Sequence, residues 1–214
     1  MKAQRQDGFN FLSPDQLKSP PGLPTGISDL DGFLSTGGLP RGGLTCLSGS
    51  PGLGATSLWM QMLKLSQLRG GLGAWIESQN SVLNPWTLKQ QGIKLDQLFW
   101  VSPPKDLKQK LWVLSEICSL DLFESVTCSL DRDFLKDHQL IKLKRLAKRH
   151  HVALIFISNQ AWSHPELDLS IHFQKKQTLI LKARHRPTPH SLERRDLYAH
   201  ALSEFASERK VLCG

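Results

Sequence analysis

The sequence predicts an α/β fold with a mostly parallel central sheet, helices on its faces and an antiparallel hairpin near the C-terminus. Short apolar runs rich in β-branched and aromatic residues alternate with amphipathic stretches. A glycine-rich turn joins the first of these runs to the first long amphipathic stretch. With 214 residues, of which 40% are hydrophobic, the chain is long enough to bury one core.

Each element follows from this alternation. The apolar runs predict strands over residues 44–47, 73–77, 98–101, 120–126, 152–157, 169–173 and 178–183, and the last two are close enough to pair as a hairpin. The amphipathic stretches predict helices over 55–68, 85–91, 105–118, 133–149 and 191–206. In the third helix, Leu107, Leu111 and Leu114 recur at helical spacing, so one face belongs to the core.

The composition divides the chain into three parts. We expect an N-terminal arm or tail over 1–22, a core domain over 23–190, and a C-terminal helix and tail over 191–214. No run of eighteen apolar residues exists, and the N-terminus is polar, so we expect a cytoplasmic protein without a membrane span.

The four cysteines favour no special chemistry. They are scattered, form no CxxC pair and lie in no His/Cys cluster with zinc spacing. We therefore expect reduced thiols, largely buried, and no metal site.

The net charge of +8 is concentrated in one region. Residues 142–195 hold twelve Lys or Arg and three acids, so the rest of the chain is nearly neutral. Such a field favours a polyanion or an acidic partner surface over a general effect on solubility. DNA binding explains the basic cluster as well as the alternative does, which is a solvated face or a patch for an acidic protein partner. The candidate binding residues are Lys142, Lys144, Arg145, Lys148, Arg149, Lys175, Lys176, Lys182, Arg184 and Arg186, with Trp162 as a ring for stacking on an unpaired base.

Residues 49–56 have the spacing of a phosphate-binding loop, G-x-x-x-x-G-K-[ST], with Ala55 in place of the lysine. Loss of this cation weakens phosphate binding and, still more, the stabilisation of a transition state. Two interpretations remain open, a vestigial nucleotide site and a glycine-rich turn that binds no nucleotide. The vestigial site would comprise Gly49, Gly52, Gly54, Thr56 and Ser57.

The upstream and downstream segments extend the pattern. Residues 23–34 and 37–42 carry "TG…LD…L..GGLP.G", Ala74–Glu77 follows as a strand, and residues 155–160 form a strand that ends in Asn-Gln. With the loop, these motifs resemble the RecA-type ATPase core over residues 23 to 185. The resemblance implies a RecA-like P-loop fold.

Two further positions depart from that family. Gln79 occupies the place of the family's water-activating glutamate, and an amide cannot accept the proton. The aspartate that ends the strand over 120–126 is replaced by Val126 or Thr127. Asp121 and Glu124 are the nearest carboxylates, and a register shift of two would point Glu124 into the site. We expect a degenerate ATPase site with no catalytic residues, weak or lost ATP binding, no other cofactor and no enzymatic activity.

Among degenerate relatives, the chain resembles the short bacterial ImuA (SulA-like) group. The similarity lies in its size, in Trp86, in residues 111–114 and in the helix around 143–147. It implies an accessory role in translesion synthesis and the SOS response, with RecA and an ImuB-like Y-family polymerase homologue as partners, and single-stranded DNA as a further ligand. The alternatives are an active RecA-family ATPase or recombination mediator that uses Glu77 or Glu124 as its acid, and a cell-division inhibitor.

Overall fold

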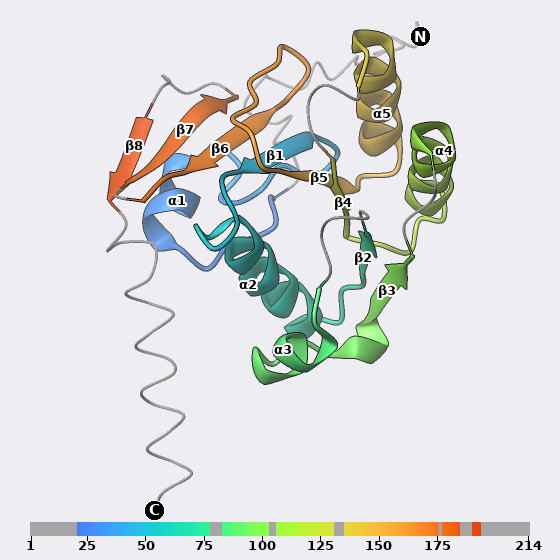
Figure 1. The fold of residues 1–214 in the computed structure, drawn as a ribbon, viewed down its shortest axis with the longest axis horizontal. Helices are drawn as coiled ribbons and strands as arrows, with labels where there is room; N and C mark the ends of the chain where they lie inside the picture. Colours follow the sequence, from blue (N-terminus) through green and yellow to red (C-terminus); the bar gives the residue numbers. More distant parts are fainter. Residues whose placement is uncertain are drawn as a thin grey trace, which may run out of the picture.

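A computed structural model describes residues 21–77, 83–102, 106–130, 135–175, 177–184 and 190–193. One eight-stranded sheet runs through these residues, in the order β3-β2-β4-β5-β1-β6-β7-β8 (Figure 1). Its strands are β1 Leu44–Ser48, β2 Gly73–Ile76, β3 Leu98–Val101, β4 Ser125–Ser129, β5 Ala153–Ser158, β6 Leu169–Phe173, β7 Gln177–Ala183 and β8 His190–Glu193.

The sheet confirms the predicted fold class. The pairs from β3 across to β6 are all parallel. Strand β7 pairs antiparallel with β6, as the predicted hairpin requires, and β8 pairs antiparallel with β7. Parallel neighbours need crossover connections, and the helices between the strands supply them.

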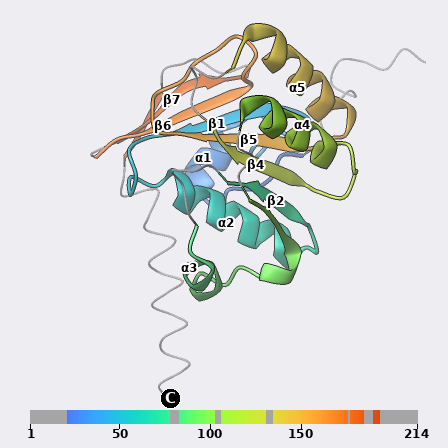
Figure 2. The ribbon, with the colours of Figure 1, turned by 45° about the vertical axis from the view of Figure 1, so that its right-hand side comes forward.

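The helices cover both faces of the sheet, as Figure 2 shows. They are α1 Ser28–Phe33, α2 Ala55–Leu68, α3 Pro85–Gln90, α4 Leu107–Cys118 and α5 Asp137–Arg149, with a 3-10 turn, η1, at Leu95–Gln97. Helices α1, α2 and α3 pack in one apolar cluster with one face of the strands, while α4 and α5 pack in a second cluster with the opposite face. The predicted helix over 55–68 is confirmed at both ends.

Strand β5 shows why a parallel sheet can form here. Ala153 and Ile155 lie in the cluster with α2, and the alternating Leu154 and Phe156 lie in the cluster with α4 and α5. All four side chains are fully buried. A strand that is apolar on both faces is typical of a sheet covered by helices on each side.

The predicted bounds of the fourth strand are wrong. Strand β4 begins at Ser125, five residues after the predicted start. Leu120 and Leu122 instead lie in the connection from α4, where they are 52% and 60% exposed. Asp121 adopts a positive φ of 54° in this turn and accepts a hydrogen bond from His150. The apolar run therefore marks a surface turn that precedes the strand.

The predicted C-terminal helix is wrong at its start. Residues His190–Glu193 form β8, because they find hydrogen-bonding partners along β7. Residues 194–206 of that predicted helix, and nearly all of the predicted N-terminal arm, lie outside the described residues.

The cysteines of the described part, Cys46, Cys118 and Cys128, are buried thiols, as predicted. Burial raises the pKa of Cys118 to about 12 and that of Cys128 to about 11, so both thiols stay protonated at neutral pH. Cys213 lies outside the described residues. None of the described helices has the length and apolar character that a bilayer crossing requires.

The parallel strands give the sheet two unlike edges. We call the edge where they end, at residues such as Ser48, Ser129 and Ser158, the carboxyl edge. The opposite edge, where Leu44 and Ala153 begin β1 and β5, is the amino edge.

Candidate functional site

The glycine-rich loop lies at the carboxyl edge, between the end of β1 and the start of α2 (Figure 1). The backbone N–H of Gly49 donates to the carbonyl of Ser158 on the neighbouring strand at 3.0 Å, which ties the loop to the sheet. In open α/β sheets, ligands bind outside the carboxyl ends of the strands. The loop is therefore in the position where such a sheet holds a phosphate.

Three glycines give the loop its path. Gly49, Gly52 and Gly54 have φ values of 151°, 81° and 124°, which residues with a Cβ atom rarely adopt. A Cβ on Gly49 would also lie 2.7 Å from the backbone oxygen of Phe173. These φ values favour glycine at all three positions.

Helix α2 starts without the cation that such a loop usually carries. Ala55 is its first residue and is 8% exposed, packed into the core cluster. Thr56 is half-buried and Ser57 is exposed. No acidic side chain lies in the first turn of α2, so its N–H groups and the positive end of its dipole remain directed at the loop. The arrangement can hold an anion through backbone N–H groups alone.

The neighbouring strands end in neutral groups. Strands β1, β4 and β5 end in Ser48, Ser129 and Ser158. The Ser48 hydroxyl donates to the carbonyl of Ile171 at 3.1 Å, and the Ser129 carbonyl accepts from the buried Lys110 ammonium at 2.8 Å. Strand β4 thus ends at Ser129, three residues after the predicted end at Val126, and both Val126 and Thr127 lie inside the strand.

One carboxylate follows β2 at this edge. Glu77 comes directly after β2 and accepts the backbone N–H of Leu83 at 3.2 Å. Gln79, the predicted substitute for the water-activating glutamate, lies outside the described residues.

Glu124 lies at the opposite end of the strands from the glycine loop, so it does not belong to the loop site. It precedes β4 at the amino edge, where it accepts hydrogen bonds from Arg41 at 2.8 Å and from Ser66. Burial opposes its ionisation, but these hydrogen bonds and the Arg41 charge outweigh burial and lower the pKa of Glu124. The idea that Glu124 supplies a substitute catalytic acid is therefore wrong. Asp121, the other nearby carboxylate, lies in the turn after α4 and pairs with His150.

The predicted basic residues separate into distinct groups. Lys144, Arg145 and Lys148 of α5 and Arg184 of β7's end line one groove at the amino edge, whereas Lys142 and Arg149 are exposed elsewhere on α5. Lys175 follows β6 at the carboxyl edge. Lys176 and Arg186 lie outside the described residues.

Two predicted binding side chains have internal roles. Trp162 is completely buried and packs on Phe156, with ring centroids 5.4 Å apart, so the prediction that it stacks on a base is wrong. The Lys182 ammonium donates to the carbonyls of His164, at 2.8 Å, and Pro165. Burial, followed by the nearby Lys144 charge, lowers the pKa of Lys182.

Arg41 and Asp168, which no sequence motif marks, join elements of the fold at the amino edge. Asp168 is 5% exposed, accepts the backbone N–H of Leu44 at 3.1 Å, and pairs with Lys144 at 3.4 Å and Arg184 at 3.7 Å. No sequence signal marks Asp168 as a hub, because its partners are far apart in the chain. Within the ranges that the structure describes, no cluster of metal-ligating residues occurs.

Comparisons with known proteins agree with this geometry. The RecA N-terminal domain model matches residues 13–128. The chain is similar to RecA of Aquifex pyrophilus, with 28% identity over 64% of this chain and 44% of the relative. It is also similar to RecA of Laribacter hongkongensis, with 37% identity over 46% and 26% of the two chains, and to the mitochondrial DNA repair protein recA homolog of Dictyostelium discoideum, with 34% identity over 44% and 21%.

The chain spans less than half the length of these relatives. The matched region runs from before α1 through β1, the glycine loop and α2 to β4. It thus contains the loop whose conformation the three glycines maintain, and it covers more than half of the chain. This protein belongs to the RecA N-terminal domain family.

Proposed function

We propose that this chain is a RecA-family binding module that acts in DNA-damage tolerance without turning over ATP. Its curated relatives carry the names RecA and DNA repair protein, which supports a role in DNA repair and recombination. The resemblance to the ImuA group supports the narrower role of an accessory protein in translesion synthesis and the SOS response.

One observation carries the proposal. The glycine loop has three glycines at positive φ, while Ala55 stands at the lysine position of the motif and β4 ends in the neutral Ser129. A hydrogen bond to a charged group contributes about 1.5–3 kcal/mol, and removal of an oxyanion-stabilising donor slows reactions by about 10²–10³. Loss of the cation and the magnesium-supporting acid thus weakens phosphate binding and affects hydrolysis more strongly.

The proposed partners are RecA and an ImuB-like Y-family polymerase homologue. Trp86 and Trp112 lie in the segments that resemble the ImuA group, and they are 67% and 63% exposed. Tryptophan is enriched at protein interfaces, because it buries a large area with few rotatable bonds. Exposed tryptophans on α3 and α4 therefore support a protein-binding role.

One observation favours a rival. Glu77 is a carboxylate at the carboxyl edge, so an ATPase that uses it as general base is the second candidate.

Nucleotide dependence of partner binding separates the two. We expect the purified full chain to bind the Y-family polymerase homologue of the same organism with the same affinity in the presence and absence of Mg·ATP, measured by surface plasmon resonance. The Thr56→Ala variant should bind equally well, because the module does not use a bound nucleotide. Absence of binding, or binding that requires ATP and disappears in Thr56→Ala, would contradict the proposal.

A further inference from the structure

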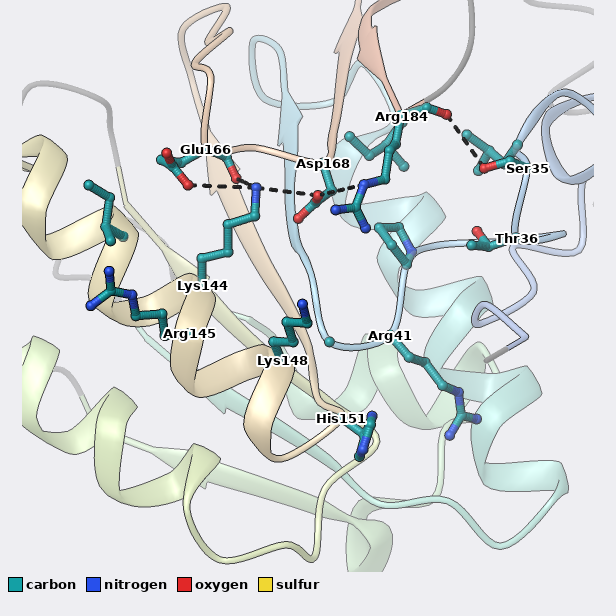
Figure 3. Close-up of a pocket in the computed structure, with 15 residues that line it drawn as sticks. Ser35, Thr36, Arg41, Lys144, Arg145, Lys148, His151, Glu166, Asp168 and Arg184 are labelled. Atoms are coloured by element: carbon teal, nitrogen blue, oxygen red, sulfur yellow. Dashed lines mark hydrogen bonds and ion pairs between the residues drawn. The ribbon is translucent and has the colours of Figure 1, made fainter. Parts of the chain in front are cut away.

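A basic groove lies at the amino edge of the sheet, at the opposite end of the strands from the glycine loop. It encloses about 810 Å³ between α5, the segment that precedes β1, the segment that precedes β6 and the end of β7. Figure 3 shows these four segments converging, with Lys148 extending from α5 into the middle of the groove. The lining contains both cationic and apolar side chains, so a ligand has to match both kinds.

Internal contacts hold the walls of the groove in place. The backbone N–H of Gly42 donates to the carbonyl of Val152 at 3.0 Å, which ties the segment before β1 to the chain that follows α5. A Cβ on Gly42 would lie 3.3 Å from the Cα of Lys148, so this segment packs directly on the helix. The buried Asp168 accepts the backbone N–H of Leu44 at 3.1 Å and joins the segment before β6 to β1. Fixed walls lower the entropic cost of binding.

Three of the five Lys and Arg side chains in the lining are engaged within the protein. Arg41 pairs with Glu124 at 2.8 Å. Lys144 lies 3.4 Å from Asp168, and Arg184 lies 3.7 Å from the same carboxylate, as the dashed lines in Figure 3 show. These three cations are therefore largely neutralised by acids of the protein itself.

The other two cations, Arg145 and Lys148, are exposed, and neither forms an ion pair with another described residue. Ile141 lies four residues before Arg145 and seven before Lys148, so the three side chains follow one stripe along α5. Ile141 is 36% exposed, and it lines the same groove. The stripe thus presents an apolar side chain and two unpaired cations over about 10 Å of helix.

This stripe matches a short acidic peptide that carries an apolar side chain. Carboxylates complement Arg145 and Lys148, and an apolar side chain covers Ile141. The exposed ring of His151, which also lines the groove, adds a second surface for packing. Exposed ion pairs alone contribute little affinity, so the apolar contact is needed. About three residues of extended chain, at about 3.3 Å each, cover the stripe.

A phosphate backbone matches the lining less well. Non-specific binding of a nucleic-acid strand uses a groove whose cations follow the backbone. Lys142 and Arg149, the other exposed cations of α5, lie outside this groove. Glu166 adds negative charge to the wall, with 31% of its side chain exposed. Ile141 offers a phosphate neither charge nor a hydrogen-bond donor, so the mixed lining favours a peptide.

The termini of this chain do not provide the complementary charge. Residues 1–20 and residues 194–214 each carry one more basic than acidic side chain. A second copy has the same net charge of +8, so charge repulsion opposes self-association through this groove. The charge balance therefore favours a different, acidic protein as the occupant.

We infer that this groove docks an acidic peptide segment of a partner protein, with an apolar side chain of the segment on Ile141 and its carboxylates on Arg145 and Lys148. The inference goes beyond the proposed function, because neither Trp86 nor Trp112 lines this groove and no bound nucleotide is involved. The peptide assay that tests it and the binding assay with the polymerase homologue use different probes, so either can fail without the other.

Selection from a phage-displayed library of random peptides of about 12 residues tests the inference without knowledge of the partner. The full chain is the bait, and the variant Arg145→Glu with Lys148→Glu removes peptides that bind elsewhere. We expect the recovered peptides to carry a surplus of Asp and Glu around at least one large apolar residue. Recovery of no peptide, or of peptides without this acidic surplus, would overturn the inference.

Fluorescence anisotropy with a recovered peptide, synthesised and labelled, then locates its site. We expect Arg145→Glu with Lys148→Glu to weaken binding at least about tenfold. The control pair, Lys142→Glu with Arg149→Glu, makes the same change in net charge outside the groove and should weaken binding by less than about threefold. Thermal unfolding checks that both double variants are folded. Equal losses in the two pairs would mean that only net charge matters, which contradicts a docking groove.

Two comparisons separate a peptide site from a general anion site. Ile141→Ser should weaken binding of the peptide at least about threefold, because its apolar contact is lost, and should leave the binding of polyglutamate unchanged. Oligothymidylate with the same number of charges should bind more weakly than the peptide. Tighter binding of oligothymidylate that disappears in Arg145→Glu with Lys148→Glu, or an Ile141→Ser variant with full affinity for the peptide, would refute the inference.

Discussion

At position 55, a methyl group stands where a phosphate loop ordinarily carries an ammonium. Ala55 is the first residue of α2, and its neighbour Gly54 has a φ of 124°, which a residue with a Cβ atom rarely adopts. Introducing the missing charge tests how much of a nucleotide site remains.

We predict that Ala55→Lys increases the affinity for Mg·ATP by about tenfold or more, because an ammonium within reach of phosphate oxygens forms charge-assisted hydrogen bonds. Titration with a fluorescent ATP analogue measures this change. Ala55→Met is the matched control, since it adds a flexible side chain without charge and should leave the affinity unchanged. Equal affinities in the two variants would show that the loop is a turn that no longer accepts phosphate.

Some single residues of the candidate sites could be predicted from the sequence, and others could not. The glycines of the loop were predictable, because their spacing reports a backbone conformation directly. The burial of Trp162 could not be predicted, because it depends on packing against Phe156, and the segment between the two residues has neither helical nor strand periodicity. Asp168 was missed for the same reason, since its charge matters only where Lys144 and Arg184 meet it.

At the scale of elements, Glu124 joins three parts of the fold at the amino edge. It precedes β4, accepts a hydrogen bond from Ser66 on α2, and pairs with Arg41 just before β1. Its lowered pKa means that the ionised form stabilises the folded state. This contribution is fully present above the ordinary pKa of a glutamate and is lost as the pH falls through the lower pKa of the folded state.

We predict that Glu124→Gln lowers the free energy of unfolding at pH 7 by about 1–2 kcal/mol, because the half-buried pair loses its charge-assisted bonds. The difference from wild type should begin to shrink as the pH falls below about 4.5, the ordinary pKa of a glutamate, and should vanish once the pH is below the lowered pKa of Glu124 in the folded state. Urea unfolding over a pH series measures both effects. Glu116→Gln, which changes an exposed residue of α4, should alter stability by no more than about 0.5 kcal/mol. A difference that persists unchanged at low pH would contradict this assignment.

Elements were predictable where local pattern and tertiary packing agree. Helix α2 has an apolar stripe and a glycine start, and its predicted bounds are exact. The predicted start of β4 is wrong, because the apolar Leu120 and Leu122 have the pattern of a strand but lie exposed in a turn. The sequence predicts the start of a helix where β8 forms, because the conformation of β8 depends on pairing with β7, which leaves no signal in the local sequence.

At the scale of the whole molecule, the two edges of one sheet carry different chemistry. The carboxyl edge holds a glycine loop with backbone donors and strand ends in serine. The amino edge gathers cations that the sequence places more than a hundred residues apart, from Arg41 to Arg184. The surplus of positive charge in residues 142–195 was evident from the sequence, but its division between a groove, an exposed helix face and internal bonds follows only from the fold.

The central claim is that this RecA-family fold persists without ATP turnover, and phosphate release from Mg·ATP by the purified full chain tests it most directly. We predict a rate equal to the blank without protein, for the wild type and for Glu77→Gln alike, because the loop lacks its cation. Turnover well above the blank that Thr56→Ala or Glu77→Gln abolishes would contradict the claim.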